Sequence, residues 1–257
     1  MGLLPNPFTG RLPFMSKPGP TPDARHALRL FRTPPHKCSY LDQETATTIF
    51  VDPEIIPSIE LLSELSDLGF RRSGSHLYRP DCESCSACVS VRIPVTEFKP
   101  SKRFRRVLSR NSDVAVRALD SIASNEEALA LYTRYINTRH QDGDMYPATK
   151  EQFDSFILST SEATRFFGFY LDDRLICIAV CDQLLQGLSA VYTFFDPDKG
   201  NRSLGSFAIL WMIQAARENN LPYVYLGYWV KECPKMEYKL DYRPIELLRD
   251  KRWIRIS

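Results

Sequence analysis

The sequence has few histidines, almost no net charge and no long apolar run. Its 257 residues include four histidines. His76 and His140 have no obvious partner, so we expect neither a histidine base nor a Ser-His-Asp arrangement. The longest charge-free stretch of strong apolar character, Ser203–Ala216, is shorter than the roughly 18 residues that a membrane span needs. The N-terminus shows no secretion signal. We therefore expect a cytoplasmic protein with no membrane partner.

The composition is that of a folded chain whose charge is unevenly distributed. Hydrophobic residues make up 44% and charged residues 25% of the chain, and the formal net charge is +2. This balance permits a packed core. Residues 1–111 carry 16 basic and 11 acidic side chains, whereas residues 112–257 carry 17 and 20. A polyanionic partner is therefore expected at the first half or at the junction between the halves.

Seven cysteines are present, and three of them form a tight run, Cys82, Cys85 and Cys88. In a cytoplasmic chain this spacing favours a metal or reduced thiols over a disulfide framework. With Cys38 as a fourth ligand, the run could hold zinc or an iron–sulfur cluster. A reduced loop without metal is the alternative, and the sequence leaves both open.

Four segments follow from composition and periodicity. Residues 1–27 form a proline-rich N-terminal arm, with six prolines in the first 22 residues. Residues 28–98 form a small α/β domain with the cysteine run. It contains a helix between Pro57 and Gly69 and strands at Ser75–Arg79 and Val89–Ile93. Residues 99–111 are a basic connecting segment, and residues 112–257 form the C-terminal domain.

The C-terminal domain has the clearer pattern. Ser124-x-x-Glu127 and Thr149-x-x-Gln152 predict capping boxes, for helices that extend to about Arg139 and Leu158. The other expected elements are three strands, an apolar helix and a buried strand, at Arg165–Leu171, Leu175–Gln183, Leu188–Phe195, Ser203–Asn219 and Tyr223–Gly227. This order predicts an α+β fold with a mixed, mostly antiparallel sheet.

The same order resembles the GCN5-related acyltransferases (GNAT). In that fold a loop before a helix holds a pyrophosphate with its backbone amides. Arg202-Ser203-Leu204-Gly205-Ser206-Phe207 matches the loop pattern in part. Phe207 stands where a small residue would let the phosphate approach. We therefore expect this scaffold without an ordinary coenzyme A site.

A set of short motifs, in a fixed order across about residues 35–250, carries a more specific resemblance. They are Cys38-Ser39-Tyr40-Leu41, Gly69-Phe70-Arg71-Arg72-Ser73-Gly74, Tyr78-Arg79-Pro80 with the cysteine run, Val91–Val95, Phe98–Ser101, Leu226–Val230, Cys233–Lys239 and Tyr242-Arg243-Pro244. The sequence resembles the arginyl-tRNA–protein transferase family, in its short bacterial leucyltransferase form.

The resemblance implies an aminoacyltransferase. Such an enzyme moves an amino acid from aminoacyl-tRNA, its co-substrate, to the α-amine of proteins that begin with Asp or Glu. The product carries an N-degron of the N-end rule and is marked for protein degradation. Eukaryotic arginyl members have a second cysteine where this chain has Leu41, which favours leucyl-tRNA over arginyl-tRNA as donor. Arginyl-tRNA stays the alternative.

Candidate site residues follow from chemistry. A proton relay near the strand ends could use Tyr192, Asp196, Tyr228 or Glu237. Arginine suits a carboxylate because its planar fork makes two hydrogen bonds. Arg71, Arg72 and Ser73 are therefore predicted to bind the acceptor carboxylate, with Arg79, Lys235 and Lys239 as further candidates. Phosphate contacts with tRNA are expected at Lys99, Lys102, Arg103, Arg105, Arg106, Arg110 and Arg202.

Two other functions remain open on sequence alone. One is a non-catalytic RNA-binding module on a degenerate acyltransferase scaffold. The other is a coenzyme-A-dependent N-acetyltransferase, which Phe207 disfavours. For the aminoacyl transfer itself we expect no required cofactor, because an amine reacts with an activated ester directly. The sequence does not indicate an oligomeric state.

Overall fold

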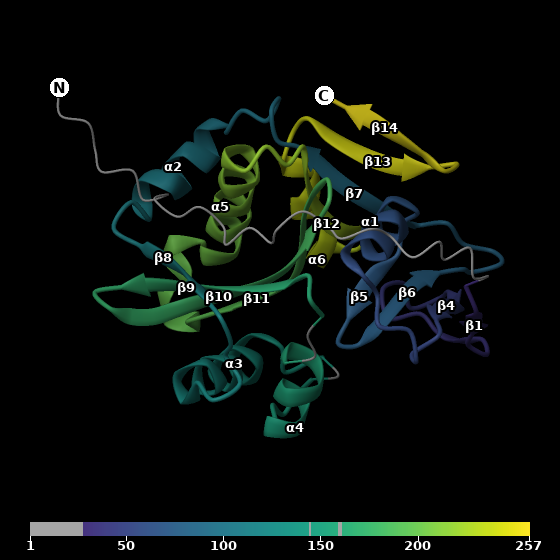
Figure 1. Ribbon diagram of the computed structural model, residues 1–257, viewed down its shortest axis with the longest axis horizontal. Helices are drawn as coiled ribbons and strands as arrows, with labels where there is room; N and C mark the ends of the chain where they lie inside the picture. The colour runs from purple at the N-terminus through teal and green to yellow at the C-terminus, as the bar shows by residue number, and fades with distance from the viewer. Residues whose placement is uncertain (1–27, 144, 159–160) are drawn as a thin grey trace.

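The computed structural model describes residues 28–143, 145–158 and 161–257. The expected arm, residues 1–27, lies outside these ranges. Within them the strands form three sheets, and helices cover both faces of the largest one (Figure 1). The mixed order of helices and strands confirms the expectation of an α+β chain with a mixed, mostly antiparallel sheet.

The largest sheet has eight strands among the described residues. In spatial order they are β14 (Arg252–Ile256), β13 (Ile245–Arg249), β7 (Cys88–Pro94), β12 (Tyr223–Val230), β11 (Gly187–Phe195), β10 (Arg174–Leu184), β9 (Thr164–Leu171) and β8 (Ala115–Leu119). β11 and β12 are parallel. The other neighbouring pairs of these strands are antiparallel.

β7 connects the two halves of the chain. It lies between β12 and β13 and pairs with β12 from Tyr223–Pro94 to Val230–Cys88. The expected domain boundary near residue 98 therefore falls after a strand that belongs to the large sheet. Val91 and Ile93 in β7, and Val95 just beyond its end, are almost fully buried in the core of that sheet.

A buried charge network fixes β7 against its neighbours. The Arg92 guanidinium donates to Glu246 Oε2 on β13 at 2.8 Å and to Asp67 Oδ1 at 2.9 Å. It also lies over the rings of Tyr223 and Trp253, at 3.6 and 4.2 Å from their centroids. Because the charges are paired and hydrogen-bonded, the network can be buried at a tolerable cost.

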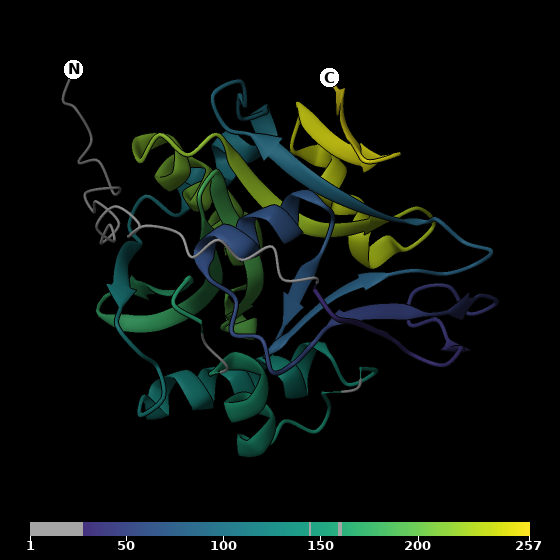
Figure 2. The same ribbon diagram turned by 45° about the vertical axis from the view of Figure 1, so that its right-hand side comes forward.

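Two smaller sheets flank the large one. The four-stranded sheet has the order β1 (Leu30–Arg32), β4 (Thr48–Val51), β6 (His76–Pro80) and β5 (Arg71–Ser73), and β2 (His36–Lys37) pairs with β3 (Thr45–Ala46). α1 (Ile59–Asp67) packs between the four-stranded sheet and the large sheet (Figure 2). Leu62 and Leu65 share a core with Leu184 and Tyr225 of the large sheet.

Helices cover opposite faces of the large sheet. α2 (Lys102–Arg110) and α5 (Leu204–Glu218) pack on one face, where Phe207 and Trp211 meet Phe167 and Phe169. α3 (Glu126–Arg139), α4 (Lys150–Gln152) and the π-helical turn η1 (Phe153–Ile157) pack on the other. The remaining short elements are η2 (Pro197–Arg202), α6 (Pro234–Glu237) and η3 (Tyr238–Asp241). No helix in the described ranges is long and apolar enough to cross a membrane.

Most expected elements are confirmed with small shifts at their ends. α1 begins after Ser58, whose side chain accepts from Leu61 N, and ends before Gly69 at φ +88°. The capping box at Thr149 and Gln152 is present. The expected box at Ser124 is wrong, because Asn125 caps α3 by accepting from Ala128 N. Asn and Ser are comparable N-cap residues, so residue type alone did not decide between Ser124 and Asn125.

Candidate active site

The large sheet opens between its two parallel strands. β11 and β12 pair at Gly187–Tyr223, Leu188–Val224 and Ser189–Tyr225, and the pairing ends there. β12 then shifts register against β7 between Tyr225 and Gly227, and Gly227 has φ +81°. This bulge turns β12 away from β11. From Ala190 onward, β11 therefore has no partner strand on the β12 side among the described residues.

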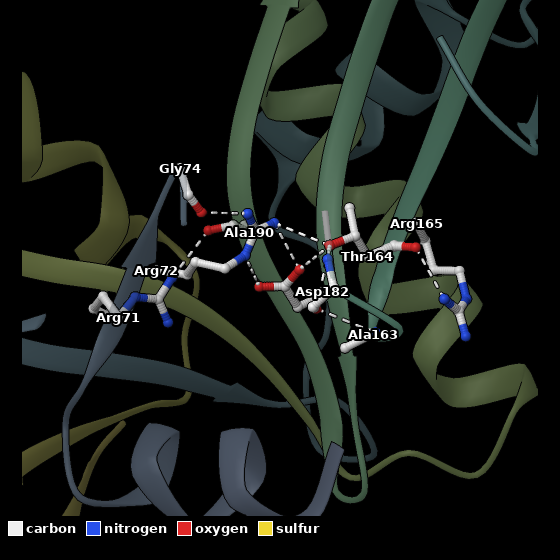
Figure 3. Close-up of polar contacts among 9 residues, drawn as sticks. Arg71, Arg72, Gly74, Ala163, Thr164, Arg165, Asp182 and Ala190 are labelled. Carbon is white, nitrogen blue, oxygen red and sulfur yellow. Dashed lines mark hydrogen bonds and ion pairs between the residues drawn. The ribbon is translucent and has the colours of Figure 1, made fainter. Parts of the chain in front are cut away.

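Arg71, the first residue of β5, fills the start of this opening. Its Nη2 donates to the Ala190 carbonyl at 2.9 Å (Figure 3). A Cβ added at Gly227 would lie 3.4 Å from Nε and Nη2 of Arg71, so glycine leaves room for the guanidinium. Arg71 is 9% exposed. Its other N–H groups have no acceptor among the described residues.

Arg72, in contrast, is engaged in a buried ion pair. Its Nε and Nη2 donate to the two Asp182 carboxylate oxygens at 2.7 and 2.8 Å, and Nη1 donates to the Gly74 carbonyl (Figure 3). The side chains of Arg72 and Asp182 are 4% and 2% exposed. Alternation along the strand explains why neighbouring arginines reach different groups. The pair ties β5 to β10, so Arg72 does not fit the clamp that the sequence suggested.

Lys239 on η3 is the second buried cation of the opening. Its Nζ donates to the Tyr228 carbonyl and lies 3.2 Å from Met236 Sδ. Lys239 is 6% exposed. Burial and, to a smaller extent, the nearby charge of Arg71 together lower the pKa of Lys239 to about 7. The structure therefore brings together Arg71 and Lys239, two of the predicted acceptor-binding residues.

Tyr78 and Tyr228 lie near Arg71, and Tyr40 packs in the same cluster as these two tyrosines. Burial raises the pKa values of Tyr40, Tyr78 and Tyr228, and the charge of Arg71 acts in the opposite direction on Tyr78 and Tyr228. The Tyr228 hydroxyl donates to the Gly69 carbonyl at 2.8 Å. With its proton held in this way, Tyr228 is a poor base, and it serves as a wall of the site.

The remaining acceptor candidates lie elsewhere. Ser73 ends β5 and pairs with His76 in the hairpin. Arg79 donates to the Leu68 carbonyl at 3.1 Å and lies over the Phe70 ring. Lys235 forms an exposed ion pair with Asp142 at 2.7 Å. None of the three faces Arg71 in the described structure.

The four proposed relay residues are not brought together. Tyr192 packs against Phe156 on the α3 face, and burial raises its pKa. Asp196, beyond the end of β11, accepts from Arg134 at 2.8 Å and lines a cavity of about 650 Å³ between α3, η2 and the β9–β10 turn. Glu237 is exposed on α6. Of the four residues, only Tyr228 lies beside Arg71.

The basic residues predicted for tRNA contacts form an exposed helix. Segment 99–111 is mostly α2, capped by Ser101, with Phe104 and Val107 facing the core. All six of its basic side chains are exposed, at Lys99, Lys102, Arg103, Arg105, Arg106 and Arg110. Arg103 pairs with Asp241 on η3. Arg202 is not free, because it makes a two-point contact with Asp113 at 2.7 and 2.9 Å.

The four predicted metal-ligating cysteines share one pocket. Cys38, Cys82, Cys85 and Cys88 line a cavity of about 350 Å³ together with Tyr40 and Val230. Burial and, to a smaller extent, the neighbouring thiols together raise the pKa of the Cys88 thiol to about 12. Among the described residues no three Cys, His, Asp or Glu side chains are arranged to hold a metal ion. The thiols as placed therefore do not form a coordination sphere.

Gly227 and Ala190 were missed by sequence reasoning as site residues. Gly227 carried a usable signal, because a glycine inside a strand pattern often marks a bulge or a close approach of another group. Ala190 contributes only its carbonyl, for which a side-chain pattern gives no signal. Phe207 was expected to obstruct a phosphate loop, yet its side chain is buried against Phe169.

The Arg72–Asp182 pair predicts a large stability effect. Arg72→Met would leave Asp182 buried without its partner, so the free energy of unfolding should fall by about 3–5 kcal/mol. Arg72→Met combined with Asp182→Leu should recover most of this loss. Urea unfolding followed by circular dichroism measures both. Arg117→Met, which removes the exposed pair with Asp173, should change stability by less than about 1 kcal/mol. Equal losses at Arg72 and Arg117 would contradict the assignment.

Comparison with known proteins places the chain in a family. The family models described as arginine-tRNA-protein transferase, N terminus and C terminus, match residues 36–106 and 127–249. Proteins named aspartate/glutamate leucyltransferase from Pseudomonas putida and Hahella chejuensis are each 52% identical to the chain. The alignments cover 90% and 89% of this chain and 97% of each relative.

Among solved structures, the C-terminal domain of a putative lysylphosphatidylglycerol synthetase from Agrobacterium fabrum gives a TM-score of 0.43 at 14% identity, over 66% of this chain and 52% of that one. This score is too low to assign a fold. The sequence matches, in contrast, cover nearly the whole chain at high identity. The chain therefore belongs to the arginine-tRNA–protein transferase family.

Proposed function

We propose that this protein transfers leucine from leucyl-tRNA to the α-amine of proteins that begin with Asp or Glu. The names of its relatives support this donor and these acceptors. The observation that carries the proposal is the pair of buried cations, Arg71 and Lys239, which lie close enough to repel each other and form no ion pair among the described residues. The acid near Arg71, Asp182, is already paired with Arg72. Such a pair of cations is an anion site, and the acceptor side chain is the anion.

Arg71 has the geometry to hold a carboxylate. One N–H is bound to Ala190, which fixes the guanidinium plane, and the remaining donors have no protein acceptor among the described residues. A planar guanidinium meets a carboxylate with two parallel hydrogen bonds. Since the site is buried, the attraction is stronger than it would be in water. An amide side chain carries no charge to match the cations, so Asn and Gln should be poor acceptors.

The reaction is aminolysis of an ester. The acceptor α-amine attacks the leucyl carbonyl, a C–N bond forms, and the C–O bond to the tRNA ribose breaks. The amine proton ends on the ribose oxygen. An α-amine has a pKa of about 8, so an appreciable fraction is neutral near pH 7. Orientation of the two reactants can supply roughly 7–11 kcal/mol of the barrier reduction, so the proposed reaction requires no cofactor.

The open side of β11 suits the developing oxyanion. Beyond Ser189 the backbone of β11 has no partner strand toward β12 in the part of the chain that the structure describes. Backbone amides directed at an oxyanion stabilise it in the transition state. Our proposal includes an acyltransferase-like (GNAT) scaffold, in which the opening between two strands is the place where the acyl group reacts. The exposed basic face of α2 would bind tRNA phosphates. In this proposal the reaction is cytoplasmic and its product carries an N-degron.

A paired transfer assay tests the proposed donor and acceptors. Purified protein is incubated with leucyl-tRNA or arginyl-tRNA that carries a labelled amino acid, and with peptides that begin with Asp, Glu, Asn or Gln. We expect label on the Asp and Glu peptides from leucyl-tRNA alone. Transfer from arginyl-tRNA would exchange the donor. Absence of transfer from both donors would favour the non-catalytic RNA-binding alternative.

Arg71 should control the acceptor rather than the donor. Arg71→Lys keeps a cation and loses the fork, which removes a charged hydrogen bond worth about 1.5–3 kcal/mol. The KM for an Asp-starting peptide should rise roughly 10–100-fold, while the KM for leucyl-tRNA stays within about twofold. Arg79→Lys, on the exposed side of the neighbouring strand, is the matched control. An unchanged peptide KM in the Arg71 variant would remove this residue from the acceptor site.

The basic helix should control tRNA affinity. Replacing Arg105 and Arg106 by glutamate should weaken tRNA binding and reduce the slope of log affinity against log salt by about 1–2, because each phosphate contact releases counterions. Filter binding between 50 and 300 mM salt, about the range in which such slopes are resolved, measures this. Lys251→Glu with Arg252→Glu, two exposed basic residues at the β13–β14 turn, is the control. A slope that is the same in both variants would show that α2 does not contact tRNA.

A further inference from the structure

Lys239 has one cation nearby and forms no ion pair with a carboxylate among the described residues. β5 presents the Arg71 cation, and β12 presents the Tyr228 carbonyl as the acceptor for Nζ. The segment before α6 presents Cys233, whose thiol is the nearby group that favours the charged lysine, and α6 itself presents Met236. On η3, the Tyr238 ring lies 5.9 Å from Nζ, and Asp241 is paired with Arg103. Glu237, at the end of α6, is exposed.

Because Arg71 lies nearby and no carboxylate of the described residues pairs with Lys239, the protonation of Lys239 should change when an anion binds beside it. Two buried cations that have no ion-pair partner repel each other, and a lysine relieves the repulsion by losing its proton, which an arginine does not do. Burial and Arg71 lower the pKa of Lys239 to about 7. A carboxylate placed beside both side chains would reverse the effect of Arg71, since an opposite charge favours the protonated form.

We propose that Lys239 determines acceptor specificity by taking up a proton when the acceptor carboxylate enters the site. This inference rests on the proposed function, because the carboxylate is that of the N-terminal Asp or Glu. The neutral fraction of Lys239 gains a proton from solvent and becomes the ammonium partner of the carboxylate. Asn and Gln bring no charge, so they leave Lys239 neutral and gain only neutral hydrogen bonds.

The sign of the pH dependence follows from linkage. A group that binds more protons in the complex than in the free protein makes binding tighter as the pH falls. Affinity for an Asp-starting peptide should therefore decrease above about pH 7, by up to about tenfold per pH unit while one proton is taken up. The peptide α-amine also titrates near pH 8. The contribution of the peptide α-amine to the pH dependence cancels when the unmodified protein is compared with Lys239→Arg, whose side chain stays charged at every pH tested.

Isothermal titration calorimetry of the full chain with an Asp-starting peptide, in the absence of tRNA, tests the proposal. Titrations at pH 7.5 in Hepes and in Tris, whose ionisation enthalpies differ, give the number of protons exchanged. The unmodified protein should take up at least about 0.5 proton more than Lys239→Arg, and its affinity relative to that variant should fall as the pH rises. Lys235→Arg, at an exposed lysine near Lys239 in the chain, should match the unmodified protein. An Asn-starting peptide should give no such difference between Lys239→Arg and the unmodified protein.

The outcomes separate this proposal from the proposed function. Binding of the Asp peptide with equal proton uptake in the unmodified protein and in Lys239→Arg would overturn the role of Lys239 and leave the acceptor assignment standing. Equal affinity for Asp and Asn peptides would overturn both. If Lys239→Arg does not fold, Lys239→Met replaces it. The dependence on the peptide carboxylate is then read from the unmodified protein with Asp and Asn peptides, and equal proton uptake with both overturns the proposal.

Discussion

The early end of the β11–β12 pairing is the constraint on which the site depends. Parallel strands normally satisfy each other's backbone groups along their length, and unpaired buried groups are costly. Here the pairing stops after Ser189 and Tyr225, and the freed Ala190 carbonyl accepts from Arg71. The guanidinium thus compensates for part of the missing ladder. In doing so it becomes a buried charge whose remaining donors face an opening in the sheet.

The position of Arg71 depends in turn on how the two halves of the chain are joined. β5 is held against the large sheet by the Arg72–Asp182 pair, and β7 is held inside that sheet by the network around Arg92. Both devices use arginine, whose fixed fork carries several donors. Arg72 contacts one carboxylate at two points, whereas Arg92 bridges the carboxylates of Glu246 and Asp67. Adjacent arginines on β5 therefore have separate tasks. Arg72 fixes β5 on the large sheet through Asp182. Because β5 is held in this place, Arg71 reaches the opening beside Ala190.

Much of the fold could be predicted from the sequence, because apolar periodicity and turn residues are local signals. The strands that became β9, β10 and β11, and the helix that became α5, lie within a few residues of their expected positions. The place of β7 between β12 and β13 was not predictable, since strand order depends on pairing between distant segments. The β13–β14 hairpin was missed because its strands carry Glu246, Arg249, Arg252 and Arg255 among their apolar residues, which obscures the alternation.

The site was predictable in its residue types and not in their grouping. Arginine and lysine are the residue types expected to bind an anion, but the sequence did not distinguish Arg71 from Arg72 as the residue that binds the acceptor carboxylate. Only their contacts separate them, because Asp182 lies 110 residues away from Arg72 in the chain. Similarly, Lys235 and Lys239 differ by one helical turn, yet one is exposed beside Asp142 and the other is buried beside Tyr228.

The unbalanced charge at this site gives a physical reason for the choice of one arginine and one lysine. Two arginines would remain charged without substrate and repel each other permanently, whereas two lysines would lack the planar fork that grips a carboxylate. Arg71 keeps its charge even when buried, and Lys239 adjusts its own. The free protein therefore avoids most of the cost of a second buried cation, and the complex regains that cation when the carboxylate is present to stabilise it.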